Sequence, residues 1–517
     1  MDGTYDAIVV GGGHNGLTAA AYLARVGQSV LVLERGEHLG GATRSEHVFA
    51  GVDARVSRYS YLVSLLPRRV VDELGLAVRL RRRRYASYTP VPDDPTRGLL
   101  VDTADDAVTA ASFASVGATA DRDAWRAFGA RTGALAARLF PTMTEPLLSQ
   151  TDARALLGEA DWRDLVENPM ADVVGSTFRD DLVRGVVLTD ALIGTFASAR
   201  DPGPANRCFL YHVIGGGTGD WDVPVGGMGS VATALEDAAR AWGADLRTRA
   251  TVTNIDPGSA AREAGVTWID DDGVERHAGS PFVLAACAPA VLDRLLGREP
   301  AGPAPEGSQL KVNMVLSRLP RLRSGIDPAL AFAGTFHVNE TATQLETAYA
   351  EAAAGQVPAT PPVETYCHSL TDDSILGPEL RASGAHTLTS FGLHMPARLF
   401  VDDPDRARES ALAATLRSLN SVLAEPIEDC LLVDADGAPC LEVRSPVDLE
   451  AEVALPGGHI FHRDLSWPWA EHDDEVGRWG VETEHPRVLL AGAGARRGGG
   501  VSAISGRAAA MVVVSRT

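Results

Sequence analysis

Lysine is almost absent from this 517-residue sequence, since Lys311 is the single lysine among 47 basic residues. Such a skew is expected where coding bias replaces lysine by arginine wherever any positive charge serves. The surviving lysine therefore indicates a role that needs a compact ammonium able to lose its proton. The alternative is chance retention at a solvated position.

Cysteine is scarce too. The chain has five, without any Cys-x-x-Cys pair: Cys208, Cys287, Cys367, Cys430 and Cys440. An odd number without paired spacing argues against a disulfide framework and a cysteine-rich zinc site, and is typical of a reducing compartment. The first apolar run, Ala7 to Val10, stops at glycines and follows no basic segment, so we expect no signal peptide. We therefore predict a cytoplasmic protein.

Long apolar runs and excess positive charge are also missing. No stretch of about 18 uninterrupted apolar residues occurs, so no transmembrane segment is predicted. The net charge of −21 argues against a nucleic-acid partner. We therefore interpret the arginine-rich run 79–84, inside a predicted strand from Val78 to Tyr88, as a solvated strand edge. The length predicts at least two domains.

The strongest motif lies at the N-terminus. A predicted strand from Tyr5 to Val10 leads into the turn Gly11-Gly12-Gly13-His14-Asn15-Gly16 and then a helix of small residues from Leu17 to Arg25. A second strand, Ser29 to Leu33, ends at Glu34. A strand–turn–helix–strand unit with an acid about 20 residues after the glycines is typical of dinucleotide binding.

Each glycine of this turn has a physical role. Gly11 permits the tight turn, Gly13 lets a diphosphate approach the backbone, and Gly16 lets the helix pack on the sheet. The helix N-terminus offers free amides and the positive end of the helix dipole. Glu34 is expected to accept both ribose hydroxyls. The cofactor-binding residues predicted here are Gly11, Gly13, His14, Asn15, Gly16, Glu34 and Arg35.

A second pair of glycines, Gly40 and Gly41, follows directly. It resembles the Gly-Gly element that closes over the FAD diphosphate in flavoproteins of the glutathione-reductase-like fold. Those proteins often carry arginine immediately after the pair, whereas here Ala42 stands there and Arg44 comes two residues later. We expect Arg44 to be the candidate for the missing phosphate contact.

Helical periodicity dominates the next part of the chain. Apolar residues recur every three or four positions, which predicts helices that would form a helical cap. The predicted helices are Asp121 to Phe140, Thr151 to Leu157, Asp161 to Glu167 and Asp180 to Leu192. The glycine-rich segment Ile214 to Gly219 lacks a preceding strand and a following helix, so we predict a turn. The sequence thus offers no second dinucleotide site for NAD(P)H.

Later segments read as a return to the cofactor domain. The predicted elements are a helix from Val231 to Trp242, strands from Thr251 to Ile255, Pro281 to Ala286 and Arg487 to Ala491, and helices from Ala290 to Leu296 and Val501 to Val514. The glycine loop before the last helix suits the pyrimidine end of a flavin, where the helix dipole would stabilise negative charge. A structural loop is the alternative. The predicted contacts are Val252, Gly494, Gly500 and Val501.

Together these motifs resemble the phytoene-dehydrogenase-like FAD oxidoreductases of the amine-oxidase and carotenoid-desaturase superfamily. The nearest branch is that of pyridine nucleotide-disulphide oxidoreductase domain-containing protein 2. The motifs that carry the resemblance are Gly11 to Leu17, Gly226 to Gly229, Lys311 to Asn313, Gly334 to His337, Gly457 to His462 and Gly492 to Val501. The sequence departs from the family where Arg496-Arg497 replaces a Thr-His-Pro type of tripeptide.

The resemblance implies an α/β fold. A glutathione-reductase-like, Rossmann-type domain assembled from discontinuous segments would hold FAD noncovalently, and an α+β substrate or cap domain would cover the flavin. The expected FAD-binding segments are 1–70, 216–300 and 456–517. The expected cap and substrate segments are 71–215 and 301–455. A peripheral membrane contact through an apolar rim is compatible with the family, although no basic amphipathic helix points to one.

Lys311 lies in a predicted strand from Leu310 to Leu316. It resembles the strand lysine that amine-oxidase-fold flavoenzymes place near flavin N5 through a water molecule. Burial there would lower the pKa of the ammonium towards neutrality. We therefore predict a catalytic or flavin-contacting role for Lys311, with a surface lysine as the alternative.

His459, His462 and Asp464 form a cluster with Trp467 and Trp469. The His-x-x-His spacing lacks a nearby third ligand, so no metal site is predicted. The two histidines are candidates for an active-site wall, and a structural loop is the alternative. A serine hydrolase is excluded because no Gly-x-Ser-x-Gly elbow occurs.

The predicted chemistry is hydride transfer from a C–H bond of a mostly apolar or secondary-metabolite substrate to flavin N5, forming C=C or C=N. Oxygen, a quinone or a carrier protein would then accept the electrons. Two alternatives stay open: an amine or amino-acid oxidase, and a flavin-free binding protein like the prenyl-protein escort factors.

Overall fold

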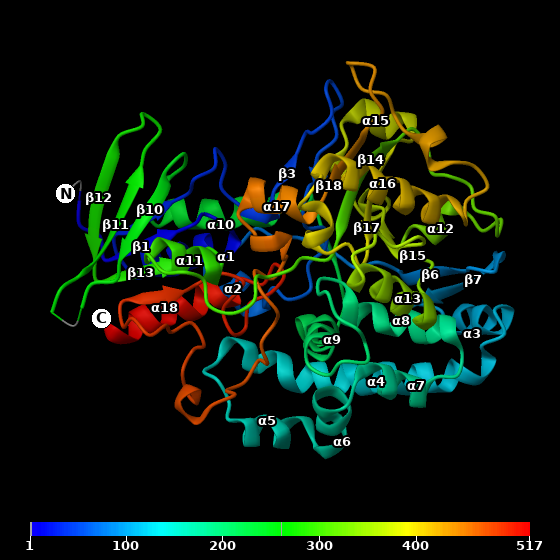
Figure 1. Cartoon of the computed structure of the whole chain (residues 1–517), viewed down its shortest axis with the longest axis horizontal. Helices are drawn as coiled ribbons and strands as arrows, with labels where there is room; N and C mark the ends of the chain where they lie inside the picture. Colours follow the sequence, from blue (N-terminus) through cyan, green and yellow to red (C-terminus); the bar gives the residue numbers. More distant parts are fainter. Residues whose placement is uncertain (1–2, 260) are drawn as a thin grey trace.

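A computed structural model describes residues 3–259 and 261–517 of the chain. At one end of the molecule lies a parallel sheet of five strands in the order β19-β13-β1-β2-β9. Its members are β1 (Ala7–Val10), β2 (Val30–Leu33), β9 (Asp245–Arg247), β13 (Phe282–Ala285) and β19 (Val488–Leu490). Four of these strands are fully buried apolar runs, as parallel strands covered on both faces require. Segments from both ends of the sequence therefore share one sheet (Figure 1).

Helices of small residues cover this sheet. Helix α1 (His14–Arg25) packs against α10 (Gly229–Ala241) and α18 (Ile504–Arg516). The approach of α18 is very close, because a Cβ at Gly506 would lie 2.0 Å from the carbonyl oxygen of Asn15. Small side chains thus let the last helix lie directly on the first. Helices α2 (Arg68–Leu74) and α11 (Pro289–Leu295) complete this part.

A three-stranded antiparallel sheet extends beside it, made of β10 (Thr251–Asp256), β11 (Ala264–Ile269) and β12 (Glu275–Ser280). The sequence predicts only the first of these strands. The burial of β11 alternates residue by residue, and Trp268 is its buried anchor. Figure 1 shows this sheet at the left edge, beside the C-terminal helix.

The second large unit is a mixed sheet of seven strands in the order β18-β14-β17-β16-β15-β6-β7. Its strands are β6 (Tyr85–Val91), β7 (Asp94–Asp102), β14 (Leu310–Leu316), β15 (Thr335–Val338), β16 (Val363–Tyr366), β17 (His386–Gly392) and β18 (Leu441–Arg444). Every residue of β14 is buried, Lys311 included. Helix α16 (Pro404–Asn420) packs against β14, β16 and β18.

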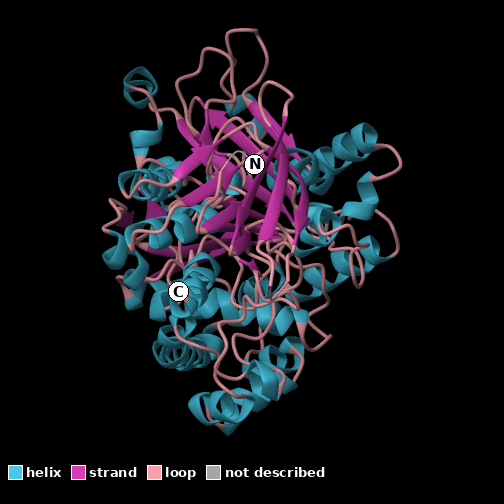
Figure 2. Cartoon of the chain, turned by 90° about the vertical axis from the view of Figure 1, so that its left-hand side faces the viewer, coloured by secondary structure: helices cyan, strands magenta, loops and turns pink. Residues whose placement is uncertain are grey.

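A layer of helices lies below this sheet in Figure 1. It contains α3 (Asp106–Ser115), α4 (Arg122–Leu139), α5 (Gln150–Leu157), α6 (Glu159–Trp162), α7 (Met170–Thr177), α8 (Asp181–Leu192) and α9 (Pro204–Ile214). Side-chain caps start three of them: Asp105, Ser149 and Asp180 accept hydrogen bonds from backbone amides of the first turns of α3, α5 and α8. The strands gather at the centre with helices around and beneath them (Figure 2).

Smaller elements join these layers. They are β3 (Ser45–Glu46), β4 (Val56–Ser57), β5 (Leu80–Arg81), β8 (Val223–Pro224), α12 (Pro328–Ala331), α13 (Ala342–Ala353), α14 (His368–Thr371), α15 (Pro378–Ser383), α17 (Pro446–Val453) and short 3-10 turns. Across the described residues, no helix combines the length and apolar character needed to cross a membrane.

One predicted strand is wrong. The segment from Val78 to Tyr88 is divided, because β5 pairs with β8 and β6 belongs to the seven-stranded sheet. Arg81, Arg82 and Arg84 are exposed, as a strand edge predicts, but Arg83 turns inward and donates to Thr335 Oγ1 at 3.1 Å. Alternation of charged residues does not show where a strand changes partner.

Candidate active site

The turn between β1 and α1 has the geometry that a diphosphate requires. Gly11 has φ +103°, which side chains disfavour, and a Cβ at Gly16 would lie 2.1 Å from the Gly11 carbonyl oxygen. At Gly13, by contrast, a Cβ would meet no atom of the described chain within 4 Å. Gly11 and Gly16 thus close the turn, and Gly13 leaves open space in front of the helix N-terminus.

Glu34 stands at the end of β2 and faces this turn. Its carboxylate accepts hydrogen bonds from the amide of Gly12 at 2.8 Å and from that of Gly36 at 2.7 Å. The side chain is thereby fixed in one orientation beside the cavity. A carboxylate held there can accept hydrogen bonds from the hydroxyl groups of a ribose.

The second glycine pair lies over the first turn. The Gly40 amide donates to the Gly12 carbonyl oxygen at 2.8 Å, and a Cβ at Gly41 would lie 3.2 Å from Gly13 Cα. Arg44 follows, with one guanidinium nitrogen 3.0 Å from a Glu46 carboxylate oxygen. Its Nε is buried without a hydrogen-bond partner in the described part of the chain. Arg44 therefore keeps a donor beside the glycine turns.

The C-terminal loop meets the same place. Gly500 and Val501 border the cavity just before α18. His14 lies against them, and burial lowers the pKa of its imidazole to about 4. Within the described residues, His14 Nε2 and Asn15 Oδ1 are buried without a hydrogen-bond partner. Buried polar atoms without a partner are rare in folded proteins, so these two mark a place where a bound group can supply the missing hydrogen bonds.

A cavity of about 390 Å³ joins these elements. The predicted cofactor residues that line it are Gly11, Gly13, His14, Asn15, Glu34, Arg35, Gly41, Arg44, Val252, Gly500 and Val501. Gly16, Gly40 and Gly494 are not in its wall. A Cβ at Gly494 would lie 2.4 Å from Pro289 Cδ, so this glycine serves close packing next to the cavity. The cavity wall thus joins Glu34 at the end of β2 to Gly500 and Val501 before α18.

Lys311 does not line this cavity but lies one side chain behind its wall. Its Nζ donates to the Ser57 carbonyl oxygen at 3.1 Å and lies 4.7 Å from the ring centre of Phe391 and 5.6 Å from that of Tyr61. Both rings line the cavity. Burial lowers the pKa of the Lys311 ammonium to about 7. The surface-lysine alternative does not match this position.

The two predicted catalytic histidines occupy different positions. His462 lines the cavity, has φ +68°, and has its pKa lowered to about 3 by burial and by His14 and His459. His459 lies behind it, only 1% exposed, with Nε2 3.3 Å from Asp464 Oδ1 and Nδ1 accepting from the Phe461 amide. His459 thus fixes the loop that carries His462.

The arginines that replace the family tripeptide point away from the cavity. Arg496 pairs with Glu471 and Glu475. Arg497 donates to the carbonyl oxygens of Glu145, Pro146 and Pro468. They tie the helical layer to the last glycine loop.

A second cavity of about 300 Å³ adjoins the first. The residues that border both are Tyr61, Leu62, Ile193, His212 and Trp221. The helical layer contributes the apolar part of its wall, including Trp125, Phe128, Val186, Val187 and Phe209. Polar and ionisable side chains form much of the rest, among them Arg83, Asp190, His337, Glu364 and Tyr366. We call this second cavity the chamber. Tyr61 stands between the chamber and the first cavity.

At the polar end of the chamber, the pKa values of several side chains depart from their usual values. Burial raises the pKa of Asp190, and burial together with Glu340 raises that of Glu364. Burial alone would lower the pKa of His337, but Glu340 and Glu364 raise it overall. Tyr61 donates to the Tyr366 hydroxyl at 3.0 Å, and Tyr366 donates to Glu364. Perturbed groups gathered in a cavity are typical of functional sites.

Sequence reasoning missed this chamber. His337 enters only as part of a resemblance motif, and Tyr61, Asp190, Glu364 and Tyr366 carry no local signal. His337 and Glu364 face each other because β15 and β16 pair antiparallel, His337 opposite Glu364. Locating both strands and their register would have been needed to bring them together.

Comparisons with known proteins agree with this geometry. Residues 9–68 match the NAD(P)-binding Rossmann-like domain. A solved structure of putrescine oxidase with redesigned cofactor binding superposes with TM-score 0.59 at 17% identity over all of both chains. Cyclohexylamine oxidase from Brevibacterium oxydans gives TM-score 0.56 at 15% identity over 99% of each chain. The predicted fold class is confirmed by these matches.

Relatives in sequence extend over the whole chain. An uncharacterized protein of Mycobacterium tuberculosis is 50% identical over 99% of this chain and 98% of its own length. Pyridine nucleotide-disulfide oxidoreductase domain-containing protein 2 of Mus musculus is 30% identical over 98% of this chain and 93% of its own length. This chain therefore belongs to the family of pyridine nucleotide-disulfide oxidoreductase domain-containing protein 2.

Proposed function

We propose that this chain is an FAD-dependent oxidoreductase of the desaturase or dehydrogenase type. It would remove hydride from a C–H bond of a mostly apolar small molecule and form C=C or C=N. The observation that supports this most is the pair of adjoining cavities, which share Tyr61, Leu62, Ile193, His212 and Trp221. One has the wall of a dinucleotide site and the other that of a substrate chamber.

The first cavity supplies the cofactor contacts of the proposal. Gly11 and Gly13 would admit the diphosphate, Glu34 would hold the ribose, and the α18 end at Gly500 and Val501 would face the flavin ring. FAD, when bound, supplies the hydride acceptor. The segments 1–70, 216–300 and 456–517 would form the FAD-binding domain, and 71–215 and 301–455 the cap and substrate part.

The second cavity supplies orientation and water exclusion. Apolar side chains from α4, α8 and α9 would hold the substrate's hydrocarbon part and keep water away from the reacting carbon. Tyr61 stands at the boundary of the two cavities, where its ring fixes the distance between substrate and cofactor. Its hydroxyl is held by Tyr366.

Lys311 would act through this wall. Its ammonium lies behind the rings of Tyr61 and Phe391, close enough for its charge to be felt in a poorly solvated site. Positive charge there would stabilise the electrons that hydride transfer brings to the cofactor. In this arrangement Lys311 is a positioning and electrostatic residue.

A second candidate function is oxidation of an amine. Asp190 and Glu364 line the substrate chamber, and a carboxylate there could bind a substrate ammonium. The structural neighbours named putrescine oxidase and cyclohexylamine oxidase share the fold. Oxygen, a quinone or a carrier protein would reoxidise the cofactor in either case.

Spectroscopy of the purified full-length protein tests the proposal. We expect a flavin absorption spectrum that is released by denaturation, and anaerobic bleaching by one class among isoprenoids, amines and cyclic imines. Bleaching by amines alone would favour the second candidate. A colourless protein that FAD does not reconstitute would contradict both and favour a flavin-free binding protein.

A further inference from the structure

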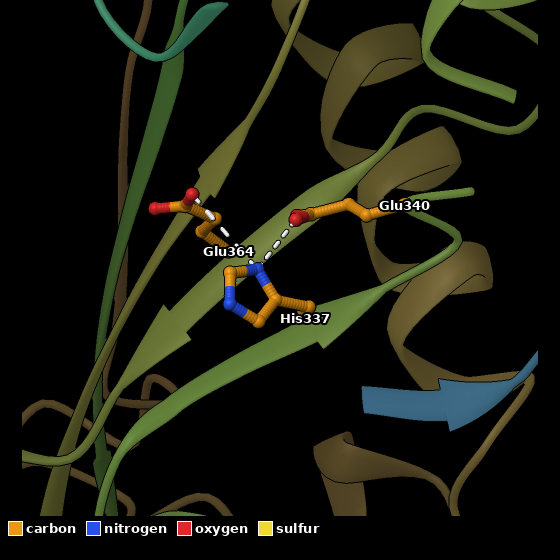
Figure 3. A group of neighbouring side chains, drawn as sticks. All are labelled: His337, Glu340 and Glu364. Atoms are coloured by element: carbon orange, nitrogen blue, oxygen red, sulfur yellow. Dashed lines mark hydrogen bonds and ion pairs between the residues drawn. The ribbon is translucent and has the colours of Figure 1, made fainter. Parts of the chain in front are cut away.

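Three ionisable side chains meet at the polar end of the second cavity. His337 on β15 stands opposite Glu364 on β16 in the antiparallel register, so both side chains lie on the same face of the sheet. Glu340 follows β15 beyond Asn339, which has φ +55° and turns the chain back. Figure 3 shows both carboxylates directed towards Nδ1 of His337.

The candidate ligand atoms of the three residues lie close together. His337 Nδ1 lies 2.5 Å from Glu340 Oε2 and 3.9 Å from Glu364 Oε1. One ligand atom from each residue falls within 4.8 Å of the other two. A tetrahedral ion bound at about 2.1 Å from each atom needs them about 3.4 Å apart. To reach that spacing, the contact between His337 and Glu340 would open by about 0.9 Å and the one between His337 and Glu364 would close by about 0.5 Å.

Burial leaves this group incompletely satisfied. Glu340 is 0%, Glu364 2% and His337 6% exposed. Glu340 Oε1 is fully buried and has no hydrogen-bond partner among the described residues. A buried carboxylate oxygen without a partner is costly, and a cation removes that cost. Asp190 lies on the same cavity wall as His337 and Glu364 and adds a further carboxylate near the group, and Arg83 is a permanent cation of that wall.

A supporting shell holds the two carboxylates in place. Thr189 Oγ1 donates to Glu340 Oε2 at 2.9 Å, and the Tyr366 hydroxyl donates to Glu364. Metal-binding carboxylates are usually oriented by such second hydrogen bonds. The third residue, His337, lies on the cavity wall together with Glu364. A ligand molecule or water in the cavity could therefore reach an ion held by all three.

We propose that His337, Glu340 and Glu364 bind one divalent transition-metal ion, with a further coordination position open to the second cavity. One imidazole and two carboxylates suit Zn²⁺, Mn²⁺ or Fe²⁺, whereas Mg²⁺ and Ca²⁺ prefer six or more oxygens. The site was not predicted from the sequence, which pointed to no metal. The proposal stands on ligand geometry and does not depend on the proposed redox function.

Titration of the metal-free full-length protein with Zn²⁺, followed by calorimetry, tests the site. We expect one high-affinity ion per chain, and a loss of affinity of at least about 100-fold in each of His337→Gln, Glu340→Gln and Glu364→Gln. The matched control is His368→Gln. His368 lies 3.5 Å from Asp372 in another His–carboxylate pair that lacks a third ligand within the described residues. Its removal should leave the affinity unchanged.

Two results would overturn the proposal. One is wild-type affinity no higher than that of His337→Gln, which would make the group a hydrogen-bonded triad without metal. The other is equal loss in His368→Gln, which would mean unspecific binding. Circular dichroism checks the fold of each variant, and anomalous scattering from a Zn²⁺-soaked wild-type crystal must place the ion between the three residues. Titrations with and without FAD separate this outcome from that of the redox proposal.

Discussion

Replacing Lys311 by methionine should make the protein more stable at neutral pH. The ammonium is buried, and its pKa falls from 10.5 to about 7. At 1.36 kcal/mol per pKa unit, this drop corresponds to about 5 kcal/mol against the charged form. The negative charge of Glu442 offsets only part of the effect of burial on the pKa. Methionine has a similar length and no charge to desolvate.

The pH dependence gives the prediction its sign. Between about pH 7 and 10.5 the unfolded chain binds a proton at Lys311 that the folded chain has released, so wild-type stability rises with pH in this window. The advantage of Lys311→Met should therefore shrink by about 4 kcal/mol from about pH 7 to about pH 10. For a chain of this length unfolding as one unit, that is about 4 °C in Tm.

Thermal unfolding of wild type, Lys311→Met and Lys311→Arg across this pH range measures the effect. Arginine stays charged, so the difference between the arginine and methionine variants should not change with pH. The reasoning is refuted if the Tm difference between wild type and Lys311→Met also stays constant with pH, as it should for the arginine variant. The same variants also test function. Lys311→Met should slow anaerobic flavin reduction, since it removes the positive charge behind the cavity wall. An unchanged rate would remove Lys311 from the mechanism.

Two further predictions concern the cofactor turn and the chamber. Gly13→Ala should weaken FAD binding at least about tenfold while leaving the Tm of the apoprotein unchanged, because its Cβ enters open space. Gly16→Ala should lower both the FAD affinity and the Tm of the apoprotein, because its Cβ would meet the Gly11 carbonyl oxygen. Equal Tm values for the two variant apoproteins would contradict this. Tyr366→Phe should cost about 1–3 kcal/mol of unfolding free energy, since it leaves the Tyr61 hydroxyl and Glu364 without their partner. A variant as stable as wild type in denaturant titrations would show that these groups find other partners.

Long, strongly patterned segments could be predicted from the sequence. The helices expected around 121–140 and 180–192 appear as α4 and α8, and the turn at Gly11 to Gly16 joins β1 and α1. In these cases the deciding interactions are local, namely the periodicity of apolar residues and the backbone freedom of glycine. The strands β9, β11 and β12 were not predicted: β9 has only three residues, and β11 and β12 form a sheet through pairing with β10 and with each other.

Local signals were enough to predict the glycine-rich turn at the N-terminal end of the fold. Its glycines, the acid at Glu34 and the small-residue helix act over a few residues, so their order along the chain already specifies what they do. The side chains that gather beside this turn, by contrast, come from distant parts of the chain. Lys311 lies behind Tyr61 and Phe391, and His337 meets Glu364, because strand register and the packing of the helical layer place side chains from distant segments in one poorly solvated space. The strength of their mutual electrostatic effects depends on that space and cannot be read from spacing along the chain.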